Sequence, residues 1–375
     1  MAEQRVDTIT DETGSAALMS TSKPQTVRLI HLSDPHLPTP GPVLFRALLN
    51  KRIFGYLNWQ RRRRLVHRRA ILDCLTADIQ ARGFDQLMIG GDLINIALPE
   101  EFRRARHWLM EMGPADKIMV VPGNHDTYVP IDWTIGLGQW ADYMAGFRFA
   151  KTQVGAQTLT HRMPIDTTDF PFVRRIGPVS VIGLNTSPST APGLATGHVG
   201  PAQQARLRAL LSKDSSVQGE PAPILTVLLG HHPWNDRDMA RHKRLTDGAV
   251  LITLLDDARQ TQIQAKTQTQ TQTLTQAPAP GPAMILHGHA HVPMSQRVGA
   301  HQTLHLGVAS ASYAGSQSDD QPTTGNAPPA AGQYHCFDIA PSEAGAQITL
   351  TVRAVDPRDM TVYTAYSGAP EDWQP

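Results

Sequence analysis

Cysteine, aromatic residues and long apolar runs are scarce in this chain of 375 residues. Its two cysteines, Cys74 and Cys336, lie in separate apolar stretches outside any CxxC motif, which indicates free buried thiols in a reducing compartment. No run of about 18 apolar residues occurs, so no membrane-spanning helix is predicted. Residues 1–25 lack the cationic start and apolar stretch of a secretory signal. Together these absences predict a cytoplasmic protein.

Acidic residues are missing between Asp34 and Asp73, a stretch that carries nine positive charges. We refer to residues 41–69 as the basic segment. Apolar and aromatic residues, Phe54 and Trp59 among them, alternate with its charges. The nine cations are Arg46, Lys51, Arg52, Arg61, Arg62, Arg63, Arg64, Arg68 and Arg69.

Three interpretations of the basic segment stay open. It could be a solvated helical excursion that packs its apolar face on the domain. It could instead dock on an anionic membrane, which would make the protein membrane-peripheral. It could also cradle the phosphate of a nucleotide or nucleic acid, although only its arginines favour a nucleic-acid partner. The arginine tetrad Arg61, Arg62, Arg63 and Arg64 is a candidate substrate-binding group, suited to a pyrophosphate in a lipid headgroup.

Metal-ligand residue types, by contrast, are plentiful, and they follow strand-like apolar runs. The runs are Val27–Leu32, Gln86–Ile89, Lys117–Val121, Val179–Leu184, Ile224–Leu229 and Ala283–Leu286. The blocks that follow them contain Asp34 and His36, Asp92, Asn124 to Asp126, Asn185, His231 and His232, and His289 and His291. Strands that end in this way bring such side chains together at the carboxyl edge of a sheet. Imidazole, carboxylate and amide ligands without thiolate suit divalent transition metals.

The order of elements predicts an α/β layered domain. Helices are predicted over Arg64–Ala81, Pro99–Met112 and Pro201–Leu211, and late strands over Tyr334–Ile339 and Gln347–Val355. We expect a disordered segment at 1–25, one domain at 26–358 and a polar tail at 359–375. The Thr/Gln-rich and Pro/Ala-rich stretch 260–282 is expected to be a flexible insertion, and 316–332 a loop.

The blocks D-x-H, G-D, G-N-H-D, H-x-P and G-H-x-H, in this order between residues 34 and 291, resemble the calcineurin-like metallophosphoesterase superfamily. Within it, the chain looks most like the class III cyclic-nucleotide phosphodiesterase branch. The resemblance implies a four-layer α/β/β/α sandwich of two mixed sheets, with the metal site on loops at one edge. It also implies two divalent metal ions per chain, drawn from manganese, iron, zinc and cobalt.

The family pattern also implies a role for each matching residue. One metal ion would be held by Asp34, His36 and His291, the other by Asn124, His231 and His289, and Asp92 would bridge them. His125 would contact the phosphoryl group and protonate the leaving oxygen, and Asp126 would orient His125. For Asn185, a role in the site and simple turn chemistry are both open. His232 is a lesser candidate for substrate binding, and His31 and His287 are expected to be core histidines.

The activity implied is cleavage of a phosphodiester or pyrophosphate bond by a metal-activated hydroxide. A lipid-headgroup pyrophosphatase at the membrane surface, a nuclease and a non-catalytic metal-binding scaffold are the alternatives. Asn95 stands where purple acid phosphatases carry tyrosine, so a ferric phenolate site is not expected. Asp126 stands where protein phosphatases carry glutamate, which argues against that activity. The natural substrate, the metal and the oligomeric state are not set by the sequence.

Overall fold

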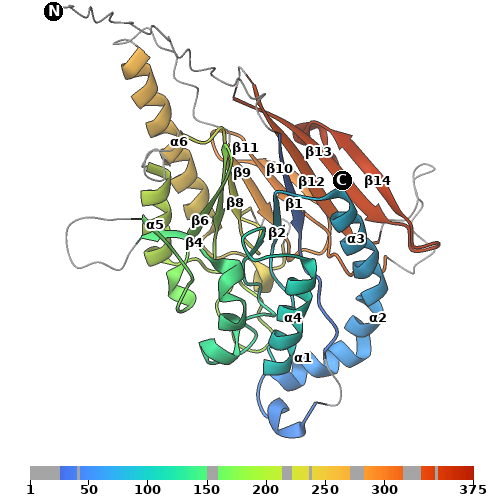
Figure 1. Ribbon diagram of the computed structural model, residues 1–375. Helices are drawn as coiled ribbons and strands as arrows, with labels where there is room; N and C mark the ends of the chain where they lie inside the picture. Colours follow the sequence, from blue (N-terminus) through green and yellow to red (C-terminus); the bar gives the residue numbers. More distant parts are fainter. Residues whose placement is uncertain are drawn as a thin grey trace, which may run out of the picture.

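Two mixed β-sheets lie face to face in the computed structural model, and helices cover their outer sides (Figure 1). The structure describes residues 26–39, 43–149, 159–212, 222–235, 239–270, 283–315, 331–342 and 345–375. The predicted four-layer α/β/β/α sandwich is thereby confirmed. None of the helices in this part of the chain is long and apolar enough to cross a bilayer. The segment 1–25 and most of the loop 316–332 fall outside the described residues.

One sheet has the order β14-β13-β12-β1-β2-β3 and the other β10-β11-β9-β8-β7-β6-β4-β5. Strands β1, β2 and β3 are parallel, as are β7, β8, β9 and β11. The first sheet comprises β1 (Val27–Leu32), β2 (Gln86–Ile89), β3 (Ile118–Val120), β12 (Gln333–Ser342), β13 (Gly345–Val355) and β14 (Val362–Gly368). The second comprises β4 (Gly146–Phe149), β5 (Leu159–Arg162), β6 (Phe172–Ile176), β7 (Val179–Gly183), β8 (Leu225–Leu229), β9 (Ala283–His287), β10 (Met294–Val298) and β11 (Thr303–Gly307).

The longer helices pack on the outer faces of both sheets, whereas the short α1 and α2 lie in the basic segment. Strand β8 shows why, because its residues alternate between two clusters: Val227 faces the core between the sheets and Leu228 faces α5 and α6. Figure 1 shows α5 and α6 on one side of the sandwich and α3 on the other. The main helices are α1 (Arg52–Asn58), α2 (Arg64–Val66), α3 (Arg69–Arg82), α4 (Pro99–Met112), α5 (Pro201–Ser212) and α6 (Gly248–Gln270).

The predicted helix Arg64–Ala81 is interrupted in the structure. Residues His67 and Arg68 leave the helix, and His67 forms an isolated β-bridge with Tyr313. The amide of Arg68 donates to the carbonyl of Ser312 at 2.8 Å. This long-range pairing competes with the helical hydrogen bonds, a tertiary effect that local periodicity does not contain.

Two further expectations need correction. Residues 260–270 continue helix α6 and are not a flexible insertion there, and the Gln262 side chain donates to the carbonyl of Leu211 at 2.9 Å. Residues 271–282 lie outside the described part. The tail expected at 359–375 instead contains β14, which pairs with β13, and the Trp373 side chain is buried. The domain therefore extends beyond residue 358.

Two histidines in the core predict acid sensitivity. His31 and His335 are fully buried, and their ring nitrogens have no hydrogen-bond partner among the described residues. Burial, followed by the charge of His287, lowers the pKa of His335 to about 3, and burial followed by His335 lowers the pKa of His31 well below its ordinary value. Both rings therefore stay neutral in the folded state at pH values where the unfolded chain binds protons.

Stability should therefore fall as the pH drops below about 6.5, by about 2 kcal/mol per ring between pH 7 and pH 5. The His335→Leu variant should lose about 2 kcal/mol less than the wild type over this interval. Urea unfolding at the two pH values measures the difference. Equal losses in both proteins would show that His335 does not stay neutral in the fold.

Candidate metal centre

Seven ligand-type side chains from five loops meet at the carboxyl ends of the parallel strands. The loops follow β1, β2 and β3 in one sheet and β8 and β9 in the other. Asp34, His36, Asp92 and His291 each offer a ligand atom, and all four atoms lie within 4.8 Å of one another. We call these four residues the Asp34 subset. A divalent cation is the group that such a buried cluster of imidazoles and carboxylates fits.

A second group adjoins the first, and we call its members, Asn124, His231 and His289, the His231 subset. The Nε2 atom of His231 lies 3.1 Å from Asn124 Oδ1, 3.2 Å from His289 Nδ1 and 3.4 Å from Asp92 Oδ2. The same Asp92 Oδ2 is 3.9 Å from His36 Nε2 in the Asp34 subset. Asp92 therefore stands between the two subsets, in the position that the sequence predicts for a bridging carboxylate.

Three of the rings have a defined rear contact. His36 Nδ1, His231 Nδ1 and His289 Nε2 lie 3.3, 2.7 and 3.1 Å from the backbone carbonyls of Ile94, Gly90 and Lys243. Because a carbonyl only accepts, each rear nitrogen carries the hydrogen. The opposite nitrogen is then available with its lone pair toward the site, which is the tautomer that a metal ligand needs.

The ligand atoms that face the centre are arranged to bind a cation and not to satisfy one another. His36 Nε2 and His291 Nε2 approach to 3.2 Å, and His291 Nε2 is also 3.2 Å from Asp34 Oδ1. Asp34 Oδ1 is buried and accepts no hydrogen bond from the described residues. Asp34 Oδ2, by contrast, accepts the amide of His289 at 3.0 Å. A buried carboxylate oxygen without a donor is costly by itself, and a cation bound between Asp34 Oδ1 and the two imidazole nitrogens would relieve that cost.

The ionisation of Asp92 and His231 also favours a bound cation. Burial would raise the pKa of Asp92, but His231, His125 and His36 outweigh it and hold that pKa well below its usual range. Burial would lower the pKa of His231, but Asp92 and Asp34 raise it to about 9. The carboxylates thus favour positive charge at this point, which a proton or a divalent cation supplies.

Backbone strain is concentrated on the ligands. Asp34, His36, Asp92, His289 and His291 all have positive φ angles, between 41° and 64°. Residues with a Cβ seldom adopt this left-handed region, and such strain is typical of functional sites. Five ligands in this conformation indicate that the loops hold side-chain positions at the expense of local backbone energy.

Two glycines explain why the motifs place glycine before the ligands. A Cβ on Gly123 would lie 2.2 Å from Asp92 Oδ1, and a Cβ on Gly288 would lie 2.2 Å from Asp34 Oδ2. Both positions allow one ligand loop to pass directly behind the carboxylate of another. Any larger residue would displace a carboxylate of the centre.

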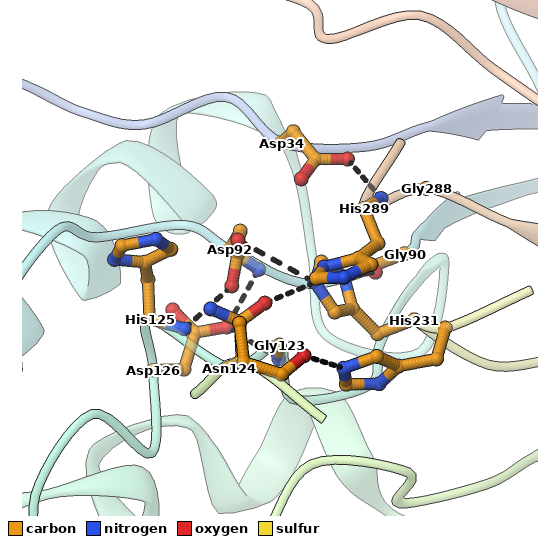
Figure 2. Close-up of polar contacts among 12 residues, drawn as sticks. Asp34, Gly90, Asp92, Gly123, Asn124, His125, Asp126, His231, Gly288 and His289 are labelled. Carbon is orange, nitrogen blue, oxygen red and sulfur yellow. Dashed lines mark hydrogen bonds and ion pairs between the residues drawn. The ribbon is translucent and has the colours of Figure 1, made fainter. Parts of the chain in front are cut away.

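His125 sits beside this cluster. Its amide donates to Asp92 Oδ1 at 2.7 Å, its Nδ1 contacts the carbonyl oxygen of Asn95, and its ring stacks on Tyr128. In Figure 2, His125 lies on the side of Asp92 away from His289. His125 lines the cavity of the centre together with Asp92 and Asn124.

Asp126 differs from the prediction that it orients His125. Its carboxylate accepts the backbone amides of Asp92 and Gly123, both at 2.8 Å, and that of Ile94 at 3.2 Å (Figure 2). The carbonyl of Asn95 contacts the rear nitrogen of His125 instead. Asp126 therefore ties the loops after β2 and β3 together, and its influence on His125 runs through the backbone.

Asn185 and His232 lie outside the cavity at the metal centre. Asn185 Oδ1 accepts the amide of Ser187, a turn contact, and its side chain lines a separate cavity with His198. His232 is fully buried, with Nδ1 2.9 Å from Thr186 Oγ1 and Nε2 3.2 Å from the Ala195 carbonyl. Both ring nitrogens of His232 are thus occupied within the core, and Asn185 Oδ1 is used in a turn, so neither residue belongs to the cluster at the metal centre.

The cavity over the two subsets has a volume of about 410 Å³. Asn58, Val66 and His67 of the basic segment line it. The backbone of Arg61 to Arg64 lies between these residues, and the Arg61 side chain is exposed; the other three side chains are outside the description. Asp92, Asn124, His125, Ala195, Lys243, His289, Ala290 and His291 complete the lining. Sequence reasoning missed His67 and Lys243, which belong to no motif.

Comparisons with known proteins agree with this architecture. A sequence model of the family described as calcineurin-like phosphoesterase matches residues 27–293. No curated protein sequence matches the chain.

Among solved structures, a sulfate thiohydrolase SoxB from Thermus thermophilus is 16% identical, with a TM-score of 0.43, covering 90% of this chain and 58% of its own. A 5'-nucleotidase precursor from the same organism is 12% identical, with a TM-score of 0.43 and coverages of 90% and 56%. The chain thus spans little more than half the length of these two. The phosphoesterase Yfce from E. coli is 12% identical, with a TM-score of 0.29 and coverages of 92% and 99%. No conclusion about activity follows from likenesses this distant.

Proposed function

The chain belongs to the calcineurin-like phosphoesterase family, and on that premise we propose that it is a dinuclear metal-dependent hydrolase of phosphodiester or pyrophosphate bonds. The observation that carries the proposal is the pair of ligand subsets joined by Asp92 under one cavity that His125 also lines. A non-catalytic scaffold would need the ligands but has no use for His125. The class III cyclic-nucleotide phosphodiesterase branch is the part of the family that the motif order favours.

Each proposed ligand keeps the role that its position suggests. Asp34, His36 and His291 would hold one cation, and Asn124, His231 and His289 the other, with Asp92 shared. Two divalent cations held by these residues would supply Lewis acidity and a nucleophile for in-line displacement at phosphorus. The neutral imidazoles and amide bind without cancelling that charge, whereas the single shared carboxylate reduces the repulsion between the cations.

His125 would move a proton in this reaction. Its Nδ1 contacts the Asn95 carbonyl, so Nε2 is the atom that can deliver a proton to the leaving oxygen. Buried Glu101 supports this arrangement, because its carboxylate accepts the amide of Asn95 at 3.3 Å and that of Ile96 at 3.1 Å. The loop that orients His125 is thereby fixed from behind.

The proposal is tested with purified protein that has been stripped of metal and reconstituted with manganese, iron, cobalt or zinc. An artificial aryl phosphodiester, a matching aryl monoester and a dinucleotide pyrophosphate are offered as substrates. We expect metal-dependent turnover, faster on the diester or the pyrophosphate than on the monoester. Absence of turnover with every metal would leave the scaffold alternative standing.

A second candidate function places the same chemistry at a membrane surface. Among the described residues of the basic segment, six large apolar side chains are exposed, Phe54 and Leu49 by 61% and 68%. The other four are Leu44, Leu57, Leu65 and Val66. Arg46 and Arg61 of the same segment are also exposed, so apolar and cationic groups reach solvent in a segment that supplies Asn58, Val66 and His67 to the cavity lining. This combination favours peripheral contact with anionic lipid and a substrate that carries a lipid headgroup.

Changing Arg61 to Arg64 together to glutamine should weaken binding to phosphatidylserine vesicles by about two orders of magnitude or more, because each cation contributes about 1 kcal/mol near a charged surface. Wild-type binding should fall steeply with salt. Co-sedimentation measures both effects, and hydrolysis of a small diester is the control for folding. Wild-type protein that stays in the supernatant at low salt would refute the membrane proposal.

An apolar pair provides a matched comparison. The double change Phe54→Ser and Leu57→Ser should weaken vesicle binding by about tenfold or more, with little change in its salt dependence. Ile165→Ser removes a side chain of similar exposure, 63%, outside the basic segment, and should have no effect. Equal losses from the pair and from Ile165→Ser would mean that the basic segment has no special part in binding.

A further inference from the structure

His67 is the one histidine that the basic segment brings to the metal centre, and no motif of the family pattern contains it. Its backbone is fastened to the strip after β11: His67 pairs with Tyr313, and the amide of Ala314 donates to the carbonyl of Val66 at 2.8 Å. Together with the hydrogen bond from the Arg68 amide to the Ser312 carbonyl, these contacts fix the point at which the basic segment ends and α3 begins. The position of the His67 side chain is thus set by a β-type anchor.

The ring of His67 lies against two members of the Asp34 subset. Its centroid is 4.5 Å from that of His36 and 5.3 Å from that of His291. The three residues each offer a ring nitrogen, and these nitrogens lie within 4.8 Å of one another. His67 also lines the cavity of the centre. A third imidazole is therefore within reach of the place where His36 and His291 converge.

Hydrogen bonds at the rear of the ring indicate which nitrogen faces the centre. His67 Nδ1 is 2.8 Å from Ser312 Oγ and 3.4 Å from Ser310 Oγ. Both hydroxyls can donate to the carbonyl of Asp34, Ser310 at 2.7 Å and Ser312 at 3.5 Å. When both hydroxyls donate to that carbonyl, both serines accept from His67 Nδ1. The lone pair is then on Nε2, the same tautomer that His36 and His231 adopt through backbone carbonyls.

We propose that His67 completes the Asp34 subset by offering Nε2 as an additional nitrogen ligand to a divalent cation. The inference rests on the proposed dinuclear centre and goes beyond it. If His67 is a ligand, the basic segment is part of the metal site, because the bound cation would connect this segment and α3 to the loops after β1 and β9. Ser312 is then a positioning residue, since it sets the tautomer and the direction of the ring.

Cobalt(II) binding tests this proposal without relying on turnover. His67→Phe keeps an aromatic ring against His36 but removes the nitrogen, and His67→Ala removes the ring in case phenylalanine does not fit. Metal-free protein is titrated with Co²⁺, and visible absorption and melting temperature are followed. We expect one of two binding steps to weaken by about tenfold or more in both variants, and the cobalt bands of that step to change intensity as its coordination number falls.

Two controls separate ligation from structure. His107→Phe alters an exposed histidine on α4 and should leave both steps and the spectrum unchanged. Ser312→Ala should weaken the same step by a smaller factor while the spectrum stays close to wild type, because the ring remains able to bind. The melting temperatures of the metal-free variants should match the wild type, and their metal-induced increase should be smaller.

The proposal is overturned if His67→Phe and His67→Ala bind two equivalents with wild-type affinity and wild-type spectrum. It is also overturned if both lower the melting temperature of the metal-free protein by as much as that of the metal-bound one, since that result assigns His67 a purely structural role. Failure of the wild type to bind two Co²⁺ ions is a different outcome, and it contradicts the dinuclear centre itself.

Discussion

Replacing Asp92 with alanine is expected to abolish hydrolysis and to leave at most one tightly bound metal ion per chain. Asp92 Oδ2 is the atom that approaches both His231 and His36, so its loss removes a ligand from each subset at once. It also removes the negative charge that offsets the repulsion between two cations held about 3.5–4 Å apart. Metal analysis after gel filtration, in parallel with diester hydrolysis, measures both effects.

Asp92→Asn is the matched variant. Asparagine retains the size of the side chain and an oxygen that can accept the amide of His125, as Asp92 Oδ1 does. It lacks the charge, so it should lose metal and activity nearly as completely as alanine. Two bound ions with near wild-type turnover in either variant would contradict the assignment of Asp92 as the shared ligand.

Replacing His125 with alanine should have a different signature. Metal content should be retained, because the His125 ring belongs to neither subset, while turnover falls by roughly 10² to 10⁴. The loss should depend on the leaving group. A nitrophenolate leaves without a proton, so an aryl diester should suffer less than an alkyl diester that needs protonation of its leaving oxygen.

Rates of the two substrates with wild type and His125→Ala give this comparison directly. His107→Ala on the exposed side of α4 is the control and should leave both rates unchanged. Equal losses on both substrates would assign His125 to contact with the phosphoryl group and not to proton transfer. Loss of a metal ion would show that the division between ligands and His125 is wrong.

Local sequence was sufficient to predict the strands that lead into the centre. The runs before Asp34, Asp92 and His231 became β1, β2 and β8 within a residue at either end, because buried parallel strands read as short apolar runs. The motifs were recognisable partly because they contain glycines that the structure requires. At Gly123 and Gly288, a loop passes behind a carboxylate of the centre and leaves no room for a Cβ.

Long-range contacts account for most of what the sequence did not contain. His67 reaches the centre through a bridge to Tyr313, which is far away along the chain. Asn95 contacts His125 through a backbone carbonyl, a group that every residue possesses and that no residue pattern can single out. Asp126 likewise binds backbone amides on two loops, and the residue pattern does not predict these contacts either. Strand β14 was missed because its side chains are mostly exposed or half-buried, so it has little apolar signal.

The central claim is that two cations act together in one centre. It is tested most directly by titrating metal-free protein with Mn²⁺ while bound metal and diester turnover are measured on the same samples. The account predicts saturation at two ions per chain, with most of the activity appearing as the second ion binds. Full activity at one ion per chain, or no tight binding of Mn²⁺ and of the other candidate metals, would contradict it.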